Sequence, residues 1–262
     1  MKWWMVFLVL PLFLQPNSTL RAQQDKRTAP PWEKKHAVEF AYHYAVQQPY
    51  AALAHRYGTF LSNGLTVGFQ LAASPWSWSF AYDYFFGKTV KEDPLAWLRD
   101  EYGHIYGWDE SGATPANVLL RMRGAWVGPT VDYALRILHQ QSLHHFIQAS
   151  IGMGVMRHRI YFVDDSRSVA QLFGNYGRGL DRLTGGPSLR FALRYRLLDA
   201  KNRRNFSITL FSYFARTRNL RSFNYDQMAY DRMYKSDITA GISVSYHLRY
   251  YFANQSKELI FY

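Results

Sequence analysis

The segment at residues 238–252 alternates between two kinds of side chain, and this pattern constrains the fold more than any other feature. Its apolar positions are every second residue: Ile238, Ala240, Ile242, Val244, Tyr246, Leu248, Tyr250 and Phe252. Because successive side chains of a strand point to opposite faces, a period of two predicts a strand with one apolar face. The segment is longer than a typical strand of a soluble sheet, but its length fits a tilted strand that crosses a bilayer. We therefore predict a membrane-spanning strand whose apolar face meets lipid.

Seven earlier segments repeat this alternation, at residues 36–46, 64–72, 76–86, 116–137, 144–156, 188–197 and 206–215. The connections between them alternate between long loops, at 47–63, 87–115, 157–187 and 216–237, and short turns near 73–75, 138–143 and 199–202. The regular change between long and short connections is typical of outer-membrane barrels, whose short turns lie in the periplasm. The sequence predicts an all-β fold, a transmembrane antiparallel up-and-down barrel over residues 36–252, with about eight strands. The first and last strands should pair to close it.

Arginines on the strands indicate which face points inward. An arginine that faces lipid near the bilayer midplane costs roughly 2–4 kcal/mol. Segment 188–197 carries three arginines on one face, so we expect this face to line the lumen. An eight-stranded barrel is just wide enough for side chains to fill it, and buried charges need partners. We predict a lumen ion-pair network of Glu39, Asp83, Arg121, Arg123, Arg190, Arg194 and Arg196. A narrow polar conduit is the alternative interpretation of the same residues.

The fourth strand has the least regular pattern. The predicted inward position of Arg121 and Arg123 places three apolar side chains on the outside, namely Leu120, Met122 and Trp126. Gly128 and Pro129 follow, and this pair favours a β-bulge. In the loop before this strand, Asp93 and Pro94 predict a short N-capped helical turn at residues 95–101.

The N-terminal segment predicts export, and both ends of the chain are predicted to lie outside the barrel. A positive start at Met1 and Lys2, an apolar run at 3–14 and a polar stretch that ends at Ala22 indicate a Sec-type signal peptide, residues 1–22. The apolar run is shorter than the roughly 20 residues that a membrane helix needs. We expect residues 23–35 to form a periplasmic linker and residues 253–262 a C-terminal periplasmic tail. The sequence has no cysteine, so it predicts neither a disulfide nor a thiolate metal site.

Composition indicates the partners. The chain has 31 Lys and Arg against 19 Asp and Glu, a net charge of +12. For an exported chain, the expected partners are outer-membrane lipids and lipopolysaccharide, whose phosphates are anionic, and no nucleic acid. Aromatic residues make up 18% of the chain, with 20 Tyr and 8 Trp. Tyr and Trp have apolar bodies and polar tips that suit the headgroup region, so this excess supports a membrane barrel rather than a soluble β-sandwich.

The eight alternating segments and the closing strand resemble the small OmpA/OmpX/OmpW-type barrels of Gram-negative outer membranes, over about residues 38–252. Within the last strand, a polar residue, a glycine and two later hydrophobic residues resemble the signal for insertion by the barrel-assembly machinery: Thr239, Gly241, Val244 and Tyr246. The resemblance implies that this machinery is a partner during biogenesis. The chain continues beyond the usual terminal aromatic, so Phe252 and Tyr262 are alternative ends of the signal.

The third long loop holds a charged cluster of Asp164, Asp165, Arg167, Arg178, Asp181 and Arg182. We expect mutual salt bridges that order this loop, and the alternative is a site for a sugar or a phosphate. Its glycines lack the strand and the Lys-Ser/Thr ending of a phosphate-binding P-loop.

Catalytic and metal chemistry has little support. None of the nine histidines is followed two residues later by Ser or Thr, although lipid A deacylases of the PagL kind have a His-x-Ser pair. His104 with Asp109, and His158 with Asp164, are possible general bases. His144 and His145 are adjacent and should point to opposite faces, which is poor geometry for one metal ion. We predict a non-enzymatic barrel, without metal or cofactor, that presents four long extracellular loops to a partner protein, to lipopolysaccharide or to the exterior. The alternatives are a small-solute conduit and a lipid A-modifying enzyme.

Overall fold

The computed structural model describes residues 35–72, 74–139, 143–164, 168–199, 205–221 and 223–252. The predicted signal peptide, almost all of the predicted linker and the predicted C-terminal tail lie outside these residues. Among the described residues, no helix is long and apolar enough to cross a membrane.

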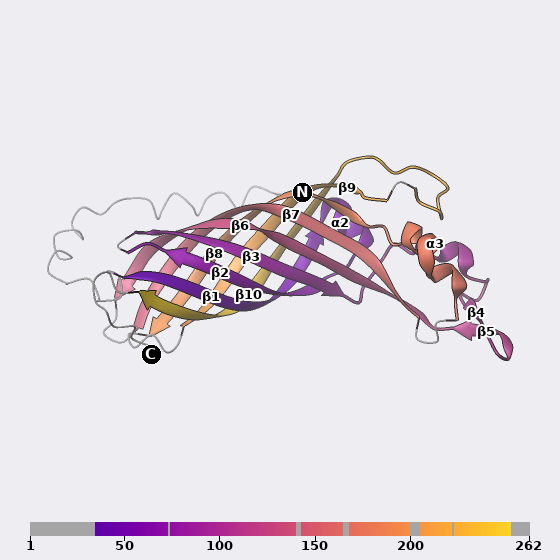
Figure 1. The fold of residues 1–262 in the computed structure, drawn as a ribbon, viewed down its shortest axis with the longest axis horizontal. Coiled ribbons are helices and arrows are strands. Elements are labelled where there is room, and N and C mark those ends of the chain that lie inside the picture. Colours follow the sequence, from indigo (N-terminus) through magenta and orange to yellow (C-terminus); the bar gives the residue numbers. More distant parts are fainter. Residues whose placement is uncertain are drawn as a thin grey trace, which may run out of the picture.

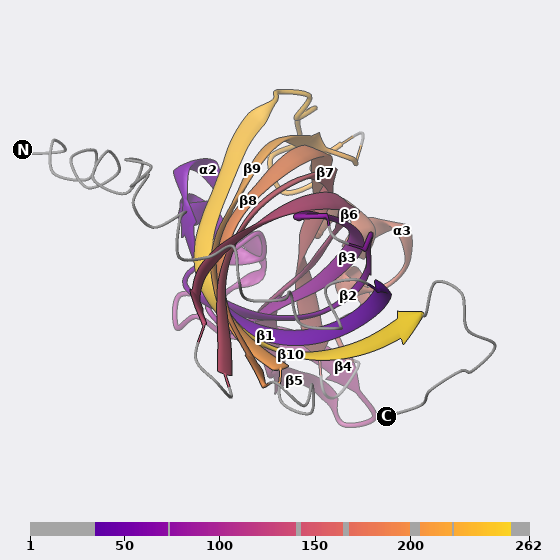
Figure 2. The ribbon, with the colours of Figure 1, turned by 90° about the vertical axis from the view of Figure 1, so that its left-hand side faces the viewer.

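Eight antiparallel strands form a closed barrel in the order β1-β10-β9-β8-β7-β6-β3-β2. Their bounds are β1 His36–Tyr50, β2 Phe60–Gln70, β3 Trp76–Gly87, β6 Val118–His139, β7 Leu143–Asp164, β8 Thr184–Asp199, β9 Asn205–Asn219 and β10 Lys235–Phe252. Figure 1 shows the barrel from the side, and Figure 2 shows the ring of strands from the end that holds the short turns. Each strand except β1 pairs with the strand before it in the barrel wall, and β1 closes the ring against β10. The predicted fold class is confirmed.

The closing pair is continuous along both strands. The register runs from His36 opposite Phe252 to Tyr50 opposite Ile238. The predicted pairing of the first and last strands is therefore confirmed, and neither of these two strands is left with an unpaired edge.

The outer wall of the barrel is apolar and exposed. Val244 on β10 is 57% exposed, and Met153 on β7 is 65% exposed, whereas the alternate residues Ser243 and Ser150 are buried. A soluble monomer rarely exposes so large an apolar surface, but lipid covers such a surface without cost. The predicted outward face of the last strand is therefore correct.

The predicted orientation of the fourth strand is wrong. Met122 and Trp126 on β6 are fully buried in the lumen, whereas Arg121 and Arg123 point outward. The energetic argument for inward arginines applies only near the bilayer midplane. The strand continues beyond the apolar wall at the loop end, and its outward arginines lie on this extension.

The predicted bulge in β6 is also misplaced. Val127 pairs with Val155 and Thr130 with Gly152, so the register is the same on both sides of Gly128. The register shifts between Arg136 and Leu138 instead. A Cβ atom on Gly128 would lie only 2.1 Å from the carbonyl oxygen of Met153, so a glycine permits the close approach of β7 here.

Several strands extend further at the loop end than the alternation predicts. β7 continues to Asp164 rather than ending near residue 156, and β9 continues to Asn219 rather than ending near residue 215. The long loops are correspondingly shorter. The barrel therefore projects beyond the part of its wall that is apolar.

The loop half of the lumen is filled by large side chains. Trp126, Phe85, Phe211 and Tyr213 belong to one buried cluster inside the barrel. The short helix α2, Ala51–Arg56, adds Leu53 to this cluster, with 1% of its surface exposed. Packed side chains therefore occupy the lumen in this half of the barrel.

The long loops have structure of their own, which we call the loop lobe: residues 88–117, 168–183 and 220–234. It contains the 3₁₀ helix η3 Ala96–Leu98, the hairpin β4 Ile105–Asp109 and β5 Gly112–Ala116, the 3₁₀ helix η4 Ala170–Leu172, and the helix α3 Gly174–Leu180. The predicted helical turn at 95–101 is only the shorter η3, and the hairpin was not predicted. Figure 1 shows the lobe beyond the loop end of the barrel.

Candidate functional site

The loop lobe has a small apolar core of its own, which meets the cluster in the barrel lumen at Leu120 and Phe162. The buried members of this core are Leu95, Ile105, Val118, Val169 and Leu180, and Tyr225 packs against them. These side chains come from the loops after β3, β7 and β9 and from the start of β6. Burial of apolar surface from several loops therefore holds the lobe together.

Arg182 joins all three loops of the lobe. Its side chain donates to Glu92 at 2.7 Å, and to both carboxylate oxygens of Asp226 at 2.7 and 2.5 Å. Burial alone would lower the pKa of Arg182, but the bonds to Asp226 and Glu92 raise it. Its backbone has a φ of +50°, an uncommon conformation for a residue with a side chain. These three bonds hold the strained residue in place.

Neighbouring contacts extend this network. Asp181 accepts two hydrogen bonds from Arg221, at 2.7 and 3.1 Å, and Glu92 also pairs with Arg56 at 3.0 Å. The backbone N–H of Trp108 donates to the carbonyl of Ser168 at 2.9 Å. The hairpin, the third loop and the fourth loop are therefore connected through both side chains and backbone.

Two members of the predicted third-loop cluster, Asp181 and Arg182, bond to other loops rather than to each other. Asp181 and Arg182 pair with Arg221, Glu92 and Asp226, while Asp164 accepts from the backbone N–H of Val169 at 3.0 Å. Arg178 is exposed on α3. Asp165 and Arg167 lie outside the described residues.

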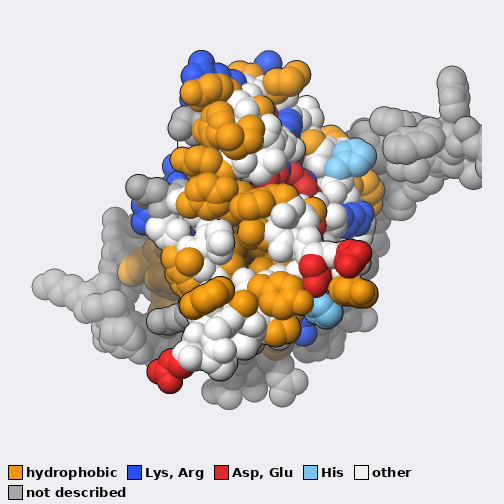
Figure 3. Space-filling model, turned by 90° about the vertical axis from the view of Figure 1, so that its right-hand side faces the viewer, with side chains coloured by type: hydrophobic (Ala, Val, Ile, Leu, Met, Phe, Trp, Pro, Cys, Tyr) orange, Lys and Arg blue, Asp and Glu red, His pale blue; other side chains and the backbone are white. Residues whose placement is uncertain are grey.

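The outer surface of the lobe carries exposed aromatic and methionine side chains. The most exposed are Tyr102, Trp108, Met228, Tyr230 and Met233, each between 65% and 78% exposed. Figure 3 faces the loop end and shows hydrophobic side chains across the middle of this surface, with Lys and Arg side chains at its upper edge. Exposed aromatic and methionine residues on an ordered surface are typical of protein interfaces.

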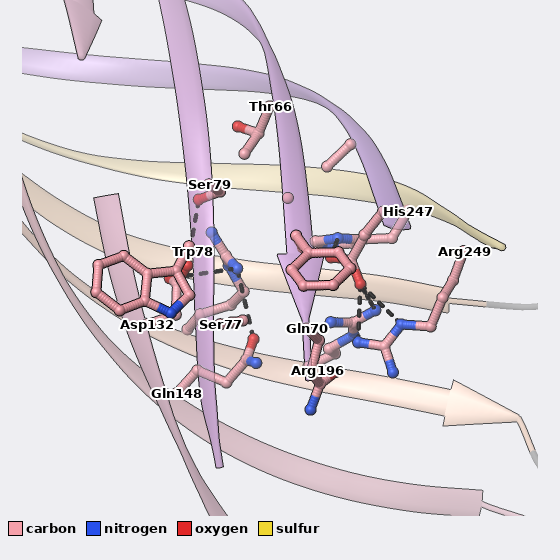
Figure 4. A pocket seen from close by; sticks show the side chains of 15 residues that line it. Thr66, Gln70, Ser77, Trp78, Ser79, Asp132, Gln148, Arg196, His247 and Arg249 are labelled. Carbon is pink, nitrogen blue, oxygen red and sulfur yellow. Dashed lines mark hydrogen bonds and ion pairs between the residues drawn. The ribbon is translucent and has the colours of Figure 1, made fainter. Parts of the chain in front are cut away.

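Glu39 is the centre of an ion-pair cluster in the turn half of the lumen. Its carboxylate lies 2.7 Å from Arg196, 2.8 Å from Arg249 and 2.7 Å from Nδ1 of His247. Figure 4 shows Arg196, His247 and Arg249 pointing toward one another. The cluster lines a small cavity of about 30 Å³.

The other charged side chains of the lumen form separate groups. Asp83 pairs with His43 and accepts from Tyr213, and Arg194 lies 3.7 Å from Asp132. Arg190 lies over the rings of Trp126, Phe211 and Tyr213. The structure thus brings Glu39 and Arg196 together, places Asp83, Arg190 and Arg194 inside, and places Arg121 and Arg123 outside. Four partners absent from the predicted network, His43, Asp132, His247 and Arg249, share the inward parity of their strands, which is the signal that would have found them.

Ser207, His247 and Glu39 have the arrangement of a Ser–His–acid triad. Ser207 Oγ lies 2.7 Å from Nε2 of His247, and Nδ1 of His247 lies 2.7 Å from Glu39. The three residues come from β9, β10 and β1, so a search for His-x-Ser on one strand does not find them. Ser207 is 2% exposed and is not among the residues that line the cavity, so a substrate has no described route to its hydroxyl.

The closed ring, the exposed apolar wall and the polar, filled lumen identify the class of fold. The chain has the fold of a small outer-membrane β-barrel. No protein-family model matches the sequence, and a search of curated proteins found no match.

Two solved structures resemble the barrel in fold at low sequence identity. Neisserial surface protein A is 10% identical, with a TM-score of 0.40, over 81% of this chain and 97% of that chain. Ail, the attachment invasion locus protein of Yersinia pestis, in complex with the heparin analogue sucrose octasulfate, is 8% identical, with a TM-score of 0.38, over 82% of this chain and 99% of that chain.

The two histidines predicted as possible general bases have partners other than the predicted ones. His104 lies 3.6 Å from Asp100 rather than beside Asp109. His158 bonds to Asp237 at 2.9 Å, inside the lumen, rather than to Asp164. Within the described part of the chain, no three His, Cys, Asp or Glu residues are placed to hold a metal ion.

The four residues of the proposed insertion signal have structural roles in β10. Thr239 is buried and donates to Gln47 at 3.1 Å, and Gly241 lies close to the carbonyl oxygen of Val46. Val244 and Tyr246 face outward. Their role in assembly remains a prediction.

Proposed function

We propose that the protein is a non-enzymatic outer-membrane barrel that holds its loop lobe at the cell exterior as a docking surface for a partner protein. One observation carries this proposal: three loops are joined into one ordered lobe by ion pairs and an apolar core, and this lobe exposes aromatic side chains. A surface that is already ordered loses less conformational entropy when it binds a partner. Rigid aromatic residues are also the side chains that contribute most to protein interfaces.

The proposed orientation of the barrel in the outer membrane follows from the lengths of the connections between its strands. The lobe lies at one end of the barrel, and the short turns lie at the other. A barrel that inserts from the periplasm keeps its short turns there, and the lobe then faces the exterior. An even number of strands places both ends of the barrel domain on the same side, which is the periplasmic side in this orientation and agrees with the predicted signal peptide.

The filled lumen supports an anchoring role over a conduit. Trp126 and Tyr213 are fully buried in the loop half of the lumen, where the ring of Tyr213 packs against those of Trp126, Phe85 and Phe211. A solute could pass only if several of these packed rings moved together.

The test is affinity purification of the full chain from its own outer membrane in mild detergent. We expect a stoichiometric partner protein with the wild type, and its loss when Trp108, Tyr230 and Met233 are all changed to Ser. Arg178→Gln, an exposed change on α3, is the matched control and should retain the partner. Recovery of the barrel alone from wild-type membranes would contradict the proposal.

The Ser207–His247–Glu39 geometry favours a second candidate, a hydrolase that acts on lipid A. This candidate predicts a changed lipid A mass spectrum after deletion of the gene. The burial of Ser207 argues against it, and we expect an unchanged spectrum.

A further inference from the structure

Six arginines lie on the outer face of the barrel wall, immediately beyond its apolar part. On β7, Arg157 is the next outward residue after Val155, and on β9, Arg216 is the next after Phe214. β6 contributes two more at the same level. We call the set the arginine belt: Arg121, Arg123, Arg157, Arg159, Arg216 and Arg218.

The belt has an excess of positive charge that the described residues do not neutralise. Arg123 and Arg159 are directly opposite each other on β6 and β7. Like charges at directly opposed positions of an antiparallel pair destabilise it. In the described part of the chain, the belt has one acidic contact, between Arg159 and Asp181 at 3.7 Å. The six arginines therefore carry more positive charge than this one acidic side chain can balance.

Arg157 and Arg218 face each other across a strand position without a side chain. Arg157 pairs with Gly185 on β8, and Gly185 pairs with Arg218 on β9. Two strand spacings separate the two arginines by about 10 Å, a distance at which two long side chains can reach one phosphate between them. A Cβ atom on Gly185 would lie 3.0 Å from Cγ of Arg157 and 3.0 Å from Cδ1 of Leu220, so the glycine lets the side chains of Arg157 and Leu220 pack over the β8 backbone.

Tyrosine rings lie close to four of the six guanidinium groups. Tyr161 lies between Arg123 and Arg159, at 5.9 and 5.5 Å from its ring centre. Tyr234 lies 4.9 Å from Arg216 and 5.9 Å from Arg218. Such contacts restrict the arginine side chains and keep their charge available to an anion.

We propose that the arginine belt binds phosphate groups of the outer-leaflet glycolipid, with one phosphate between Arg157 and Arg218. The location selects a lipid rather than a soluble anion: the belt continues the lipid-facing wall, at the level where the acyl chains end and the headgroups begin. Guanidinium groups form strong, often bidentate bonds with phosphate oxygens. This site is on the wall below the lobe, so the inference does not depend on what the lobe binds.

The experiment measures binding of purified bisphosphorylated lipid A by the full chain, folded in detergent micelles. The variants are Arg157→Gln with Arg218→Gln, and Arg178→Gln on the lobe as the matched control. We expect the double variant to bind roughly a hundredfold more weakly, about tenfold for each lost charge-assisted contact. The control should bind as the wild type does. The mobility of unheated samples on a gel confirms that each variant is folded.

Two further arms identify the ligand. Dephosphorylated lipid A should bind the wild type and the double variant equally weakly, and inorganic phosphate at the same phosphate concentration should not compete. Equal binding of bisphosphorylated lipid A by the wild type and the double variant overturns the proposal. Effective competition by inorganic phosphate overturns the assignment to a lipid.

A separate variant keeps the proposal testable if the double variant does not fold. Arg123→Gln removes the repulsion with Arg159, so it should make the barrel more resistant to urea in lipid-free micelles while weakening lipid A binding roughly tenfold. Unchanged lipid A binding by this variant would count against the belt.

Discussion

Arg182 on the third loop and Asp226 on the fourth loop form a bidentate ion pair, with Nη1–Oδ1 and Nη2–Oδ2 distances of 2.7 and 2.5 Å. Two parallel hydrogen bonds between a guanidinium and a carboxylate fix both the distance between the two groups and their relative orientation. Because Arg182 also bonds to Glu92 on the second loop, one side chain sets the relative positions of three loops.

Replacement of Arg182 by Gln should loosen the loop lobe without unfolding the barrel. The change leaves Glu92 and Asp226 without this partner, and loss of hydrogen bonds to charged groups costs about 1.5–3 kcal/mol. We expect faster proteolysis and faster amide hydrogen exchange in the lobe, with an unchanged unfolding midpoint for the barrel. Arg182→Lys keeps the charge but loses the paired geometry, so its effect should be intermediate. Exchange in the lobe equal to that of the wild type would contradict this role.

Replacement of Trp126 by Ala should destabilise the barrel and should test the conduit alternative. Trp126 is fully buried, and its indole N–H donates to Ser188 at 2.8 Å. Removal of a buried Trp side chain typically costs about 3–5 kcal/mol of unfolding free energy. Urea unfolding followed by gel mobility measures this loss. In planar bilayers we expect no conductance from the wild type, and stable wild-type channels would show that the packed rings are a gate.

The period of two was sufficient to predict the closed barrel and the lipid-facing side of β10, because lipid and lumen impose opposite requirements on alternate residues. The strand ends could not be predicted in the same way. On the extension of β6 and β7 the inner face is packed with apolar side chains such as Met122 and Ile160, while the outer face carries arginines, so the alternation continues with apolar residues inside rather than outside. Arg121 and Arg123 lie on this extension. The free-energy cost of an arginine that faces lipid applies at the bilayer midplane, so it does not apply to these two residues, and the prediction that they face inward is wrong.

The loop contacts could not be predicted from local sequence. Arg182 bonds to residues 90 and 44 positions away, and no spacing rule relates such positions. The lumen partners are a different case. His247 and Arg249 occupy the inward positions of the same strand whose alternation predicts the fold, so their parity alone places them beside Glu39 once β1 and β10 pair.

Replacement of Glu39 by Gln should destabilise the turn half of the barrel. Arg196 and Arg249 would lose their shared carboxylate, and removal of one partner of a buried ion pair costs about 3–5 kcal/mol. We expect a lower urea midpoint on gel mobility assays. Arg121→Gln, which removes a charge that the same reasoning had placed in the lumen, should change stability by less than about 0.5 kcal/mol. Similar losses in both variants would contradict the distinction between inward and outward charges.

The hairpin of the loop lobe should depend on pH in the acidic range. Hydrogen bonds from Ser111, through its hydroxyl at 2.5 Å and its backbone N–H at 2.7 Å, and from Thr114 at 2.9 Å hold the pKa of Asp109 below its usual range. Since the folded pKa is lower than the unfolded value of about 3.9, the stabilisation is complete above that pH and is lost as the pH falls through the folded pKa. NMR titration of the Asp109 carboxyl should give a midpoint below 3.9, and Ser111→Ala should raise it. A wild-type midpoint at or above 3.9 would refute the effect.

Ser207 should behave as a structural residue in spite of its triad-like partners. Its hydroxyl is buried, and the Glu39 carboxylate that orients His247 is already shared with Arg196 and Arg249. We expect a fluorophosphonate probe to leave the folded barrel unlabelled. Ser207→Ala should lower the free energy of unfolding by about 1 kcal/mol, the typical contribution of one hydrogen bond. Ser243→Ala, at another buried lumen position, is the matched control for the loss of a hydroxyl. Labelling of the wild type that disappears in Ser207→Ala and persists in Ser243→Ala would establish a reactive serine and would favour the hydrolase.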